Sequence, residues 1–315
     1  MPRVAVAFAL GLAAVVAVAP RQIAAQSAAP ALRGVVSSAG EPRMEGVLVS
    51  ATRAGSPITV TVVTDAEGRY SFPRTRLEHG SYSLRVRAIG YELNAAASVT
   101  VAAPPAHLDV TLRKTHDVAS QLSNGEWLSS WPGSVEMKNG LLTCTQCHGL
   151  EPIARSRYTA SEWVGVIERM SRHAQGIGEP PLQAALVKQT ADYLATVNLD
   201  LDGHWSYPLT TLPRPTGKAT RVVITEYALP RPEFDTKTAT FRDDAIADTA
   251  GYTWAGGMNN DRVARLNTGT GEVIEYLLPR STNIRRVHVD NRTSPPSFWA
   301  GNNLGPSLIK LEPLP

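Results

Sequence analysis

The stretch Tyr82-Ser83-Leu84-Arg85-Val86-Arg87-Ala88 alternates apolar with polar side chains at every position. Successive side chains of a β-strand point to opposite faces of a sheet, so this period of two predicts a strand with one face in a core. The apolar face carries Tyr82, Leu84, Val86 and Ala88. The opposite face carries Ser83, Arg85 and Arg87. The stretch therefore predicts a sheet that is packed on one side.

Further strand and turn signals lie upstream of this stretch. Residues 47–51 alternate in the same way, and residues 59–63 are β-branched throughout. The segments 65–68 and 78–80 each end in Gly, which accepts positive φ in tight turns. Short strands separated by such turns predict a small β-sandwich over residues 31–113.

Residues 31–113 resemble the carboxypeptidase regulatory-like domain, a transthyretin-like β-sandwich. The resemblance lies in the order of strands and turns in GVV…GEPRMEGVLVSATR…TVVTDAEGRYSF…LEHGSYSLRVRAIGY. It implies an accessory module, either a structural spacer or a carbohydrate-binding unit. We expect a spacer, because the segment carries no convergent catalytic set.

The N-terminus indicates export. Met1-Pro2-Arg3 precedes Val4–Ala19, an apolar run of sixteen residues without charge. This run is short of the roughly 20 residues that span a bilayer but suits a signal-peptide core. Residues 1–25 are therefore predicted to be a signal peptide, with an uncleaved membrane anchor as the alternative. Either interpretation places the rest of the chain outside the cytoplasm, and we expect the bacterial periplasm.

Both cysteines of the chain lie in Cys144-Thr145-Gln146-Cys147-His148, which excludes a disulfide scaffold. The spacing is that of c-type haem attachment, in which two thiols add to the porphyrin vinyl groups and the adjacent imidazole binds iron. A thioredoxin-like redox pair would need a surrounding βαβ pattern, and a zinc site would need two more ligands. We therefore predict covalent haem c on Cys144 and Cys147, with iron bound by His148.

A helix is predicted after this motif. Thr159 and Glu162 form a capping-box pattern, with Glu three positions after the N-cap residue. Trp163, Ile167 and Met170 then follow at positions that share one helix face. We expect this apolar face to cover the porphyrin.

The sixth iron ligand is predicted on the same helix. We expect Met170, because thioether ligation is common in cytochromes c. His173 is the competing ligand, about one turn further on, and Met137 is a third choice.

Residues 116–200 resemble a class I-like cytochrome c. The stretch CTQCHGLEPIARSRYTASEWVGVIERM is similar to haem domains fused to propellers in exported bacterial proteins. The resemblance implies a small all-α cytochrome c domain. Its rim is locally basic, which suits haem propionates, an acidic redox partner or plain solvation. The basic residues are Arg155, Arg157, Arg169 and Arg172.

The C-terminal part repeats itself. Residues 224–230 recur as 273–279, and 253–257 recur as 298–302. NNDRVARLNTGTGEVIEYLLP resembles the repeats of the virginiamycin B lyase family of β-propellers. The resemblance implies that residues 224–315 form about two blades of an incomplete ring, since known propellers have at least four. No catalytic residue is carried over from that family.

Residues 201–223 contain several prolines and are predicted to be a linker. Open sheet edges then predict that residues 224–315 are the least stable part of the monomer and are flexible relative to the haem domain. The expected fold class is multidomain: a transthyretin-like β-sandwich, a small all-α domain and a partial propeller.

Charge excludes one class of function. The chain carries 31 basic and 28 acidic residues, a net charge of +3, and lacks the concentrated basic face that nucleic acid requires. The predicted function is electron transfer by an exported c-type cytochrome with a redox partner protein. The alternatives are a propeller-based lyase or haem-coupled dehydrogenase, and a carbohydrate or cell-surface binding module with a haem sensor.

Overall fold

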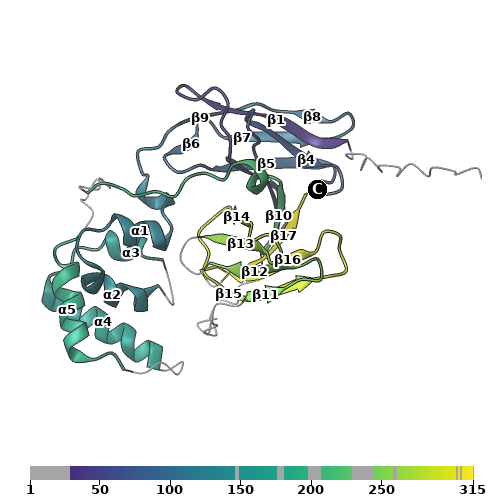
Figure 1. Ribbon diagram of the computed structural model, residues 1–315. Coiled ribbons are helices and arrows are strands. Elements are labelled where there is room, and N and C mark those ends of the chain that lie inside the picture. The colour runs from purple at the N-terminus through teal and green to yellow at the C-terminus, as the bar shows by residue number, and fades with distance from the viewer. Residues whose placement is uncertain are drawn as a thin grey trace, which may run out of the picture.

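The protein is multidomain, with an N-terminal β-sandwich, a helical region and further sheets (Figure 1). The computed structural model describes residues 29–145, 149–175, 181–197, 207–228, 245–257, 261–302, 304–305 and 307–314. The predicted signal peptide, residues 1–25, lies outside the described residues. Within the described part, no helix is both long and apolar enough to cross a bilayer.

The sandwich is built from two sheets. The first has the order β4-β1-β9-β6, with β8 also paired to β1. Its strands are β1 (Pro30–Ser38), β4 (Arg69–Pro73), β6 (Tyr91–Leu93), β8 (Ala106–His107) and β9 (Val110–Lys114). The second sheet is larger, and its sandwich strands are β2 (Leu48–Arg53), β3 (Ile58–Val63), β5 (Gly80–Arg87) and β7 (Ala97–Val101).

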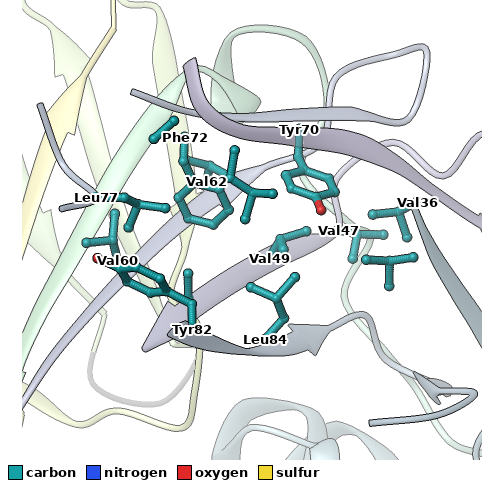
Figure 2. Packing of buried hydrophobic residues seen from close by; sticks show 14 of the residues in the cluster. Val36, Val47, Val49, Val60, Val62, Tyr70, Phe72, Leu77, Tyr82 and Leu84 are labelled. Carbon is teal, nitrogen blue, oxygen red and sulfur yellow. The ribbon is translucent and has the colours of Figure 1, made fainter. Parts of the chain in front are cut away.

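The sandwich core confirms the predicted alternation in β5. Tyr82 and Leu84 are buried, whereas Arg85 is exposed. Figure 2 shows that Tyr82 and Leu84 lie in the same apolar cluster as Tyr70 and Phe72 of β4. The rings of Tyr70 and Phe72 meet edge to face, with centroids 5.9 Å apart. Aromatic and branched side chains of the two sheets therefore close this core.

The helical region surrounds a second apolar core. Its elements are η1 (Ala119–Gln121), α1 (Asn124–Ser130), α2 (Val135–Cys144), α3 (Glu151–Ala154), α4 (Ala160–Gln175) and α5 (Ala184–Leu194). Trp127, Trp131 and Trp163 are almost completely buried in it. Helix α2 approaches α5 closely at Gly140, where a Cβ atom would lie 1.9 Å from Oγ1 of Thr190. Only glycine leaves room for this crossing.

The C-terminal part forms two four-stranded units. The first has the order β11-β12-β13-β14, and the second has the order β15-β16-β17-β10 within the large sheet (Figure 1). The strands are β10 (Val222–Ala228), β11 (Ala245–Ala247), β12 (Tyr252–Gly256), β13 (Arg262–Asn267), β14 (Val273–Leu277), β15 (Ile284–Asp290), β16 (Ser297–Asn302) and β17 (Ser307–Pro313). Strands β10 and β14 carry the repeated sequence and occupy the same fourth place. The described residues form no closed propeller.

The two units pack face to face through aromatic residues. Trp254 of β12 stacks on Phe298 of β16, with ring centroids 5.2 Å apart. Tyr276 stacks on the same tryptophan at 6.1 Å. Each unit thus buries its apolar face against the other.

Residues 224–315 are joined to the sandwich by strand pairing. Strand β10 pairs with β17 on one side and with β3 of the sandwich on the other. The β-branched run of β3 is buried on both faces, which suits an interior strand of a sheet. The large sheet is consequently continuous from the sandwich to the C-terminal part.

The predicted linker is held by contacts in its described part. Leu212 N donates to the buried carboxylate of Glu126 in α1 at 2.6 Å. The Arg214 guanidinium binds both carboxylate oxygens of Glu41 in the sandwich. Arg262 of β13 donates to the carbonyl of Pro213 at 2.7 Å. This segment therefore contacts all three parts of the protein.

Candidate functional site

Cys144 is the last residue of α2. Ser134 begins this helix by accepting a hydrogen bond from the backbone N–H of Met137. The Cys144 side chain is half-buried, packs beside the helical core, and lies 3.6 Å from the Gly140 carbonyl oxygen. Cys147 and His148 lie outside the described residues.

Thr145, the second residue of the motif, is 1% exposed. Its backbone N–H donates to the Leu141 carbonyl, and its hydroxyl donates to the Leu142 carbonyl at 2.8 Å. Its own carbonyl accepts a hydrogen bond from Nδ2 of Asn283 at 2.8 Å. Asn283 precedes β15, so the motif contacts the C-terminal sheets directly.

Leu150, two residues after the motif, is completely buried. The Leu150 N–H donates to Oδ1 of Asn124, at the start of α1, at 2.8 Å. Asn124 follows Ser123, whose capping box with Glu126 is complete. The residues on both sides of the Cys147-His148 pair are therefore fixed by buried hydrogen bonds.

The predicted capping box of α4 is confirmed. The Glu162 carboxylate accepts from the Thr159 N–H and hydroxyl, and the Glu162 N–H donates back to Thr159 Oγ1. Trp163 and Ile167 point into the helical core, but Met170 is 47% exposed at the end of this face. The structure thus places Met170 at the border between core and surface.

The other two ligand candidates differ in position. Met137 lies on α2 and is 41% exposed, and it lines a hollow of about 520 Å³ together with Tyr193 and Thr196 of the α5 region. The backbone of His173 belongs to α4, but its side chain lies outside the described part of the structure.

The helical region has features that fit haem, a large flat group with an apolar face and anionic edges. Leu142 on α2, which ends in the motif, and Met170 on α4, which follows the motif, both expose apolar surface. Two buried donors, Nε1 of Trp163 and Nδ2 of Asn124, have no acceptor among the described residues. Buried donors normally have acceptors, so these two suit carboxylate or carbonyl oxygens of a bound group. The residues present therefore fit a haem.

The basic rim is partly engaged within the protein. The Arg155 guanidinium binds both carboxylate oxygens of Asp117 at 2.7 and 2.8 Å and also contacts Glu151. Arg169 donates to the carbonyl of Gly165, one turn earlier in α4. Arg155 therefore links the helical region to the segment that leaves the sandwich.

Burial changes the pKa of two groups that hold the helices together. Burial lowers the pKa of Lys138 on α2, whose Nζ donates to the Leu128 carbonyl of α1. Burial raises the pKa of Tyr193 on α5 to about 12, and Tyr207 adds to the shift. The Tyr193 hydroxyl donates to the Pro132 carbonyl at 2.7 Å, so it joins α5 to the turn before α2.

A buried polar cluster not predicted from the sequence lies where β5 of the sandwich meets the residues that precede β13 and β15. Arg87 of β5 forms an ion pair with Asp261 at 2.8 Å, and Asp261 accepts from the Thr282 N–H. Isolated polar residues such as Asn283 carry no periodic signal, and Arg87 was expected on a solvated face. Among the described residues, no group of three or more His, Cys, Asp and Glu side chains is placed to hold a metal ion.

The comparison with known proteins concerns the sandwich. No curated protein matches the chain. The family model of the carboxypeptidase regulatory-like domain matches residues 31–113. This match confirms the resemblance seen in the strand and turn order, and the chain contains a carboxypeptidase regulatory-like domain at its N-terminal side.

Proposed function

We propose that this protein is an exported c-type cytochrome that transfers electrons to or from a redox partner protein in the bacterial periplasm. The observation that carries the proposal is the position of Cys144 and Thr145, the first two residues of the Cys-x-x-Cys-His sequence, at the end of a helix that packs on an apolar core. Cys144 and Thr145 end α2, and Leu150 re-enters the core directly afterwards.

Each residue of the motif has a separate role. The Cys144 and Cys147 thiols would hold a haem covalently, and His148 would bind its iron. Met170 is proposed as the second iron ligand, with His173 as its competitor. Haem, when bound, supplies one-electron transfer.

The surrounding residues hold the motif and limit access of water. Trp127, Trp131 and Leu141 build the apolar core beneath α2. Trp163 and Asn124 provide the buried donors described above, which we assign to oxygen atoms of the prosthetic group. The carboxypeptidase regulatory-like domain is proposed as the spacer that carries this region, with carbohydrate binding as its further possible ligand class.

The test is covalent haem on the full chain, produced with its export signal in a host that matures c-type cytochromes. We expect haem staining after denaturing electrophoresis and one haem per chain in the pyridine complex spectrum. Cys144→Ser with Cys147→Ser abolishes the stain, because both attachments are lost. An exported protein without covalent haem contradicts the proposal.

A second experiment identifies the sixth ligand. Met170→Ala removes any weak near-infrared iron–sulfur band and lowers the reduction potential, because the thioether ligand favours ferrous iron. Met137→Ala tests the third candidate ligand, and we expect it to leave both unchanged. If His173→Ala produces the change instead, His173 is the ligand.

A further inference from the structure

A chain of buried hydrogen bonds connects the sandwich, the C-terminal sheets and the Cys144–His148 motif. It begins at Arg87 on β5, whose side chain is only 9% exposed. Nη2 of Arg87 pairs with Asp261, and Nη1 donates to the Leu278 carbonyl at 2.7 Å. Asp261 and Leu278 flank the paired strands β13 and β14 at the open end of their hairpin, so the sandwich binds this end through one side chain.

Asp261 connects Arg87 to the residues that precede β15. Its backbone has φ 54°, a left-handed conformation that Asp tolerates better than most residues. One carboxylate oxygen binds Arg87 and the other accepts the Thr282 N–H at 2.8 Å. The ion pair thus fixes the backbone position of residue 282.

Asn283 completes the chain. It is fully buried, and its Nδ2 donates to the Thr145 carbonyl at 2.8 Å. The last carbonyls of an α-helix have no partner within the helix, so an external donor is needed when the helix end is buried. Asn283 supplies that donor within the motif, between Cys144 and Cys147.

We propose that Asn283 is a positioning residue for the haem-attachment motif, held in place by the Arg87–Asp261 pair. The inference rests on the proposed function, because the position of this carbonyl affects iron chemistry only when the motif carries haem. It makes the C-terminal sheets and the sandwich part of the structure that orients the haem site.

The first test measures, without haem, how much the hydrogen bond from Asn283 to Thr145 protects the motif from amide exchange. In the full chain with Cys144→Ala and Cys147→Ala, Asn283→Ala is compared with Asn291→Ala. Asn291 accepts hydrogen bonds from Thr249 at the opposite end of β15 and is the matched control. We expect amide hydrogen exchange in residues 141–150 to become roughly fivefold to tenfold faster in the Asn283 variant alone.

The second test uses the haem-loaded protein and measures its reduction potential. Asn283→Asp preserves the shape of the side chain but replaces the donor beside the Thr145 carbonyl with an oxygen. We expect a more negative potential, because an added negative charge near the haem stabilises ferric iron. Asn291→Asp adds the same charge at the far end of β15 and leaves the potential unchanged.

A third pair of variants tests the support from the sandwich. Arg87→Met removes the ion pair, whereas Arg85→Met removes an exposed arginine from the same strand. We expect faster exchange of residues 141–150 only in Arg87→Met, and a smaller effect than that of Asn283→Ala.

The outcomes separate the two proposals. Haem-loaded wild type together with unchanged exchange and unchanged potential in the Asn283 variants refutes only the positioning role. A wild-type chain without haem refutes the proposed function and the positioning role with it. If Asn283→Asp fails to fold, the exchange comparison of the alanine variants decides.

Discussion

The sandwich and the helical region close their cores in different ways. Among the described residues of the sandwich, Ile58 is the one large apolar side chain that is exposed to solvent. The helical region exposes several such side chains. They are Val135, Met137, Leu142, Tyr158 and Met170. The sandwich thus supplies its own apolar partners, whereas the helices present apolar surface of the kind that a large apolar group covers.

This difference has a physical origin in the two architectures. Two sheets face each other over their whole length, so alternating side chains can fill the space between them. The helices meet along narrower lines, such as the crossing of α2 and α5 at Gly140. We therefore expect the stability of the helical region, but not that of the sandwich, to depend on haem attachment.

The largest expected effect separates the two regions directly. Replacing Cys144 and Cys147 by Ala prevents attachment, and amide exchange in α4 and α5 should then increase more than tenfold, because the haem contacts that stabilise these helices are lost. Exchange in β2 and β5 should stay unchanged. Equal protection of the helices with and without haem contradicts the comparison.

A cavity in the sandwich core should destabilise the sandwich, in contrast to the loss of haem, which should destabilise the helices. Phe72 is completely buried between the two sheets, so Phe72→Ala should lower the free energy of unfolding by roughly 3–5 kcal/mol. Urea unfolding followed by far-UV circular dichroism measures the loss. Ile58→Ala, at a partly exposed position, should cost less than about 1 kcal/mol. A similar cost for both variants shows that the core is not closed as described.

Two helix glycines provide a sharper contrast within the helical region. Gly140→Ala places a Cβ atom against Thr190 and should destabilise the protein by about 1–3 kcal/mol. Gly165→Ala meets nothing within 4 Å on α4 and should stabilise it by about 0.5–1 kcal/mol. Thermal unfolding of both variants measures the difference. Opposite signs confirm the α2–α5 crossing, and equal shifts contradict it.

The smallest expected effect concerns alkaline pH. The pKa of Tyr193 is raised to about 12 from its ordinary value of 10, so the folded protein retains the proton more tightly than the unfolded chain. Its contribution to stability is full below pH 10 and is lost as the pH rises towards 12. Tyr193→Phe should remove this contribution and cost about 1 kcal/mol at neutral pH, because the hydrogen bond to Pro132 is lost. Urea unfolding at pH 8 and pH 11 compares the two proteins.

Local patterns predicted much of the fold. The alternation of residues 82–88 identified the buried face of β5, and Thr159 with Glu162 located the start of α4. Both features depend on residues close together in the chain. The prediction of a haem-attachment motif depends on spacing alone, since Cys144-x-x-Cys147-His148 needs no knowledge of tertiary structure.

Contacts between distant segments could not be predicted in this way. The pairing of β10 with β3 joins Val223 to Val62, and neither strand specifies its neighbour. The uninterrupted β-branched run of residues 59–63 was the available signal, because a strand buried on both faces lacks alternation. Arg87 was assigned to solvent by its place in the alternation, and its burial depends on Asp261, far away in the sequence.

The double pairing of β10 also determines the order in which the molecule is assembled. Contacts within the helices are local and form early, whereas the β10–β3 and β10–β17 ladders wait for residues near the end of the chain. Asn283, which follows the helices in sequence, then covers the backbone of the motif. The carbonyl of Thr145 therefore receives its buried donor only after the strands near the end of the chain have folded.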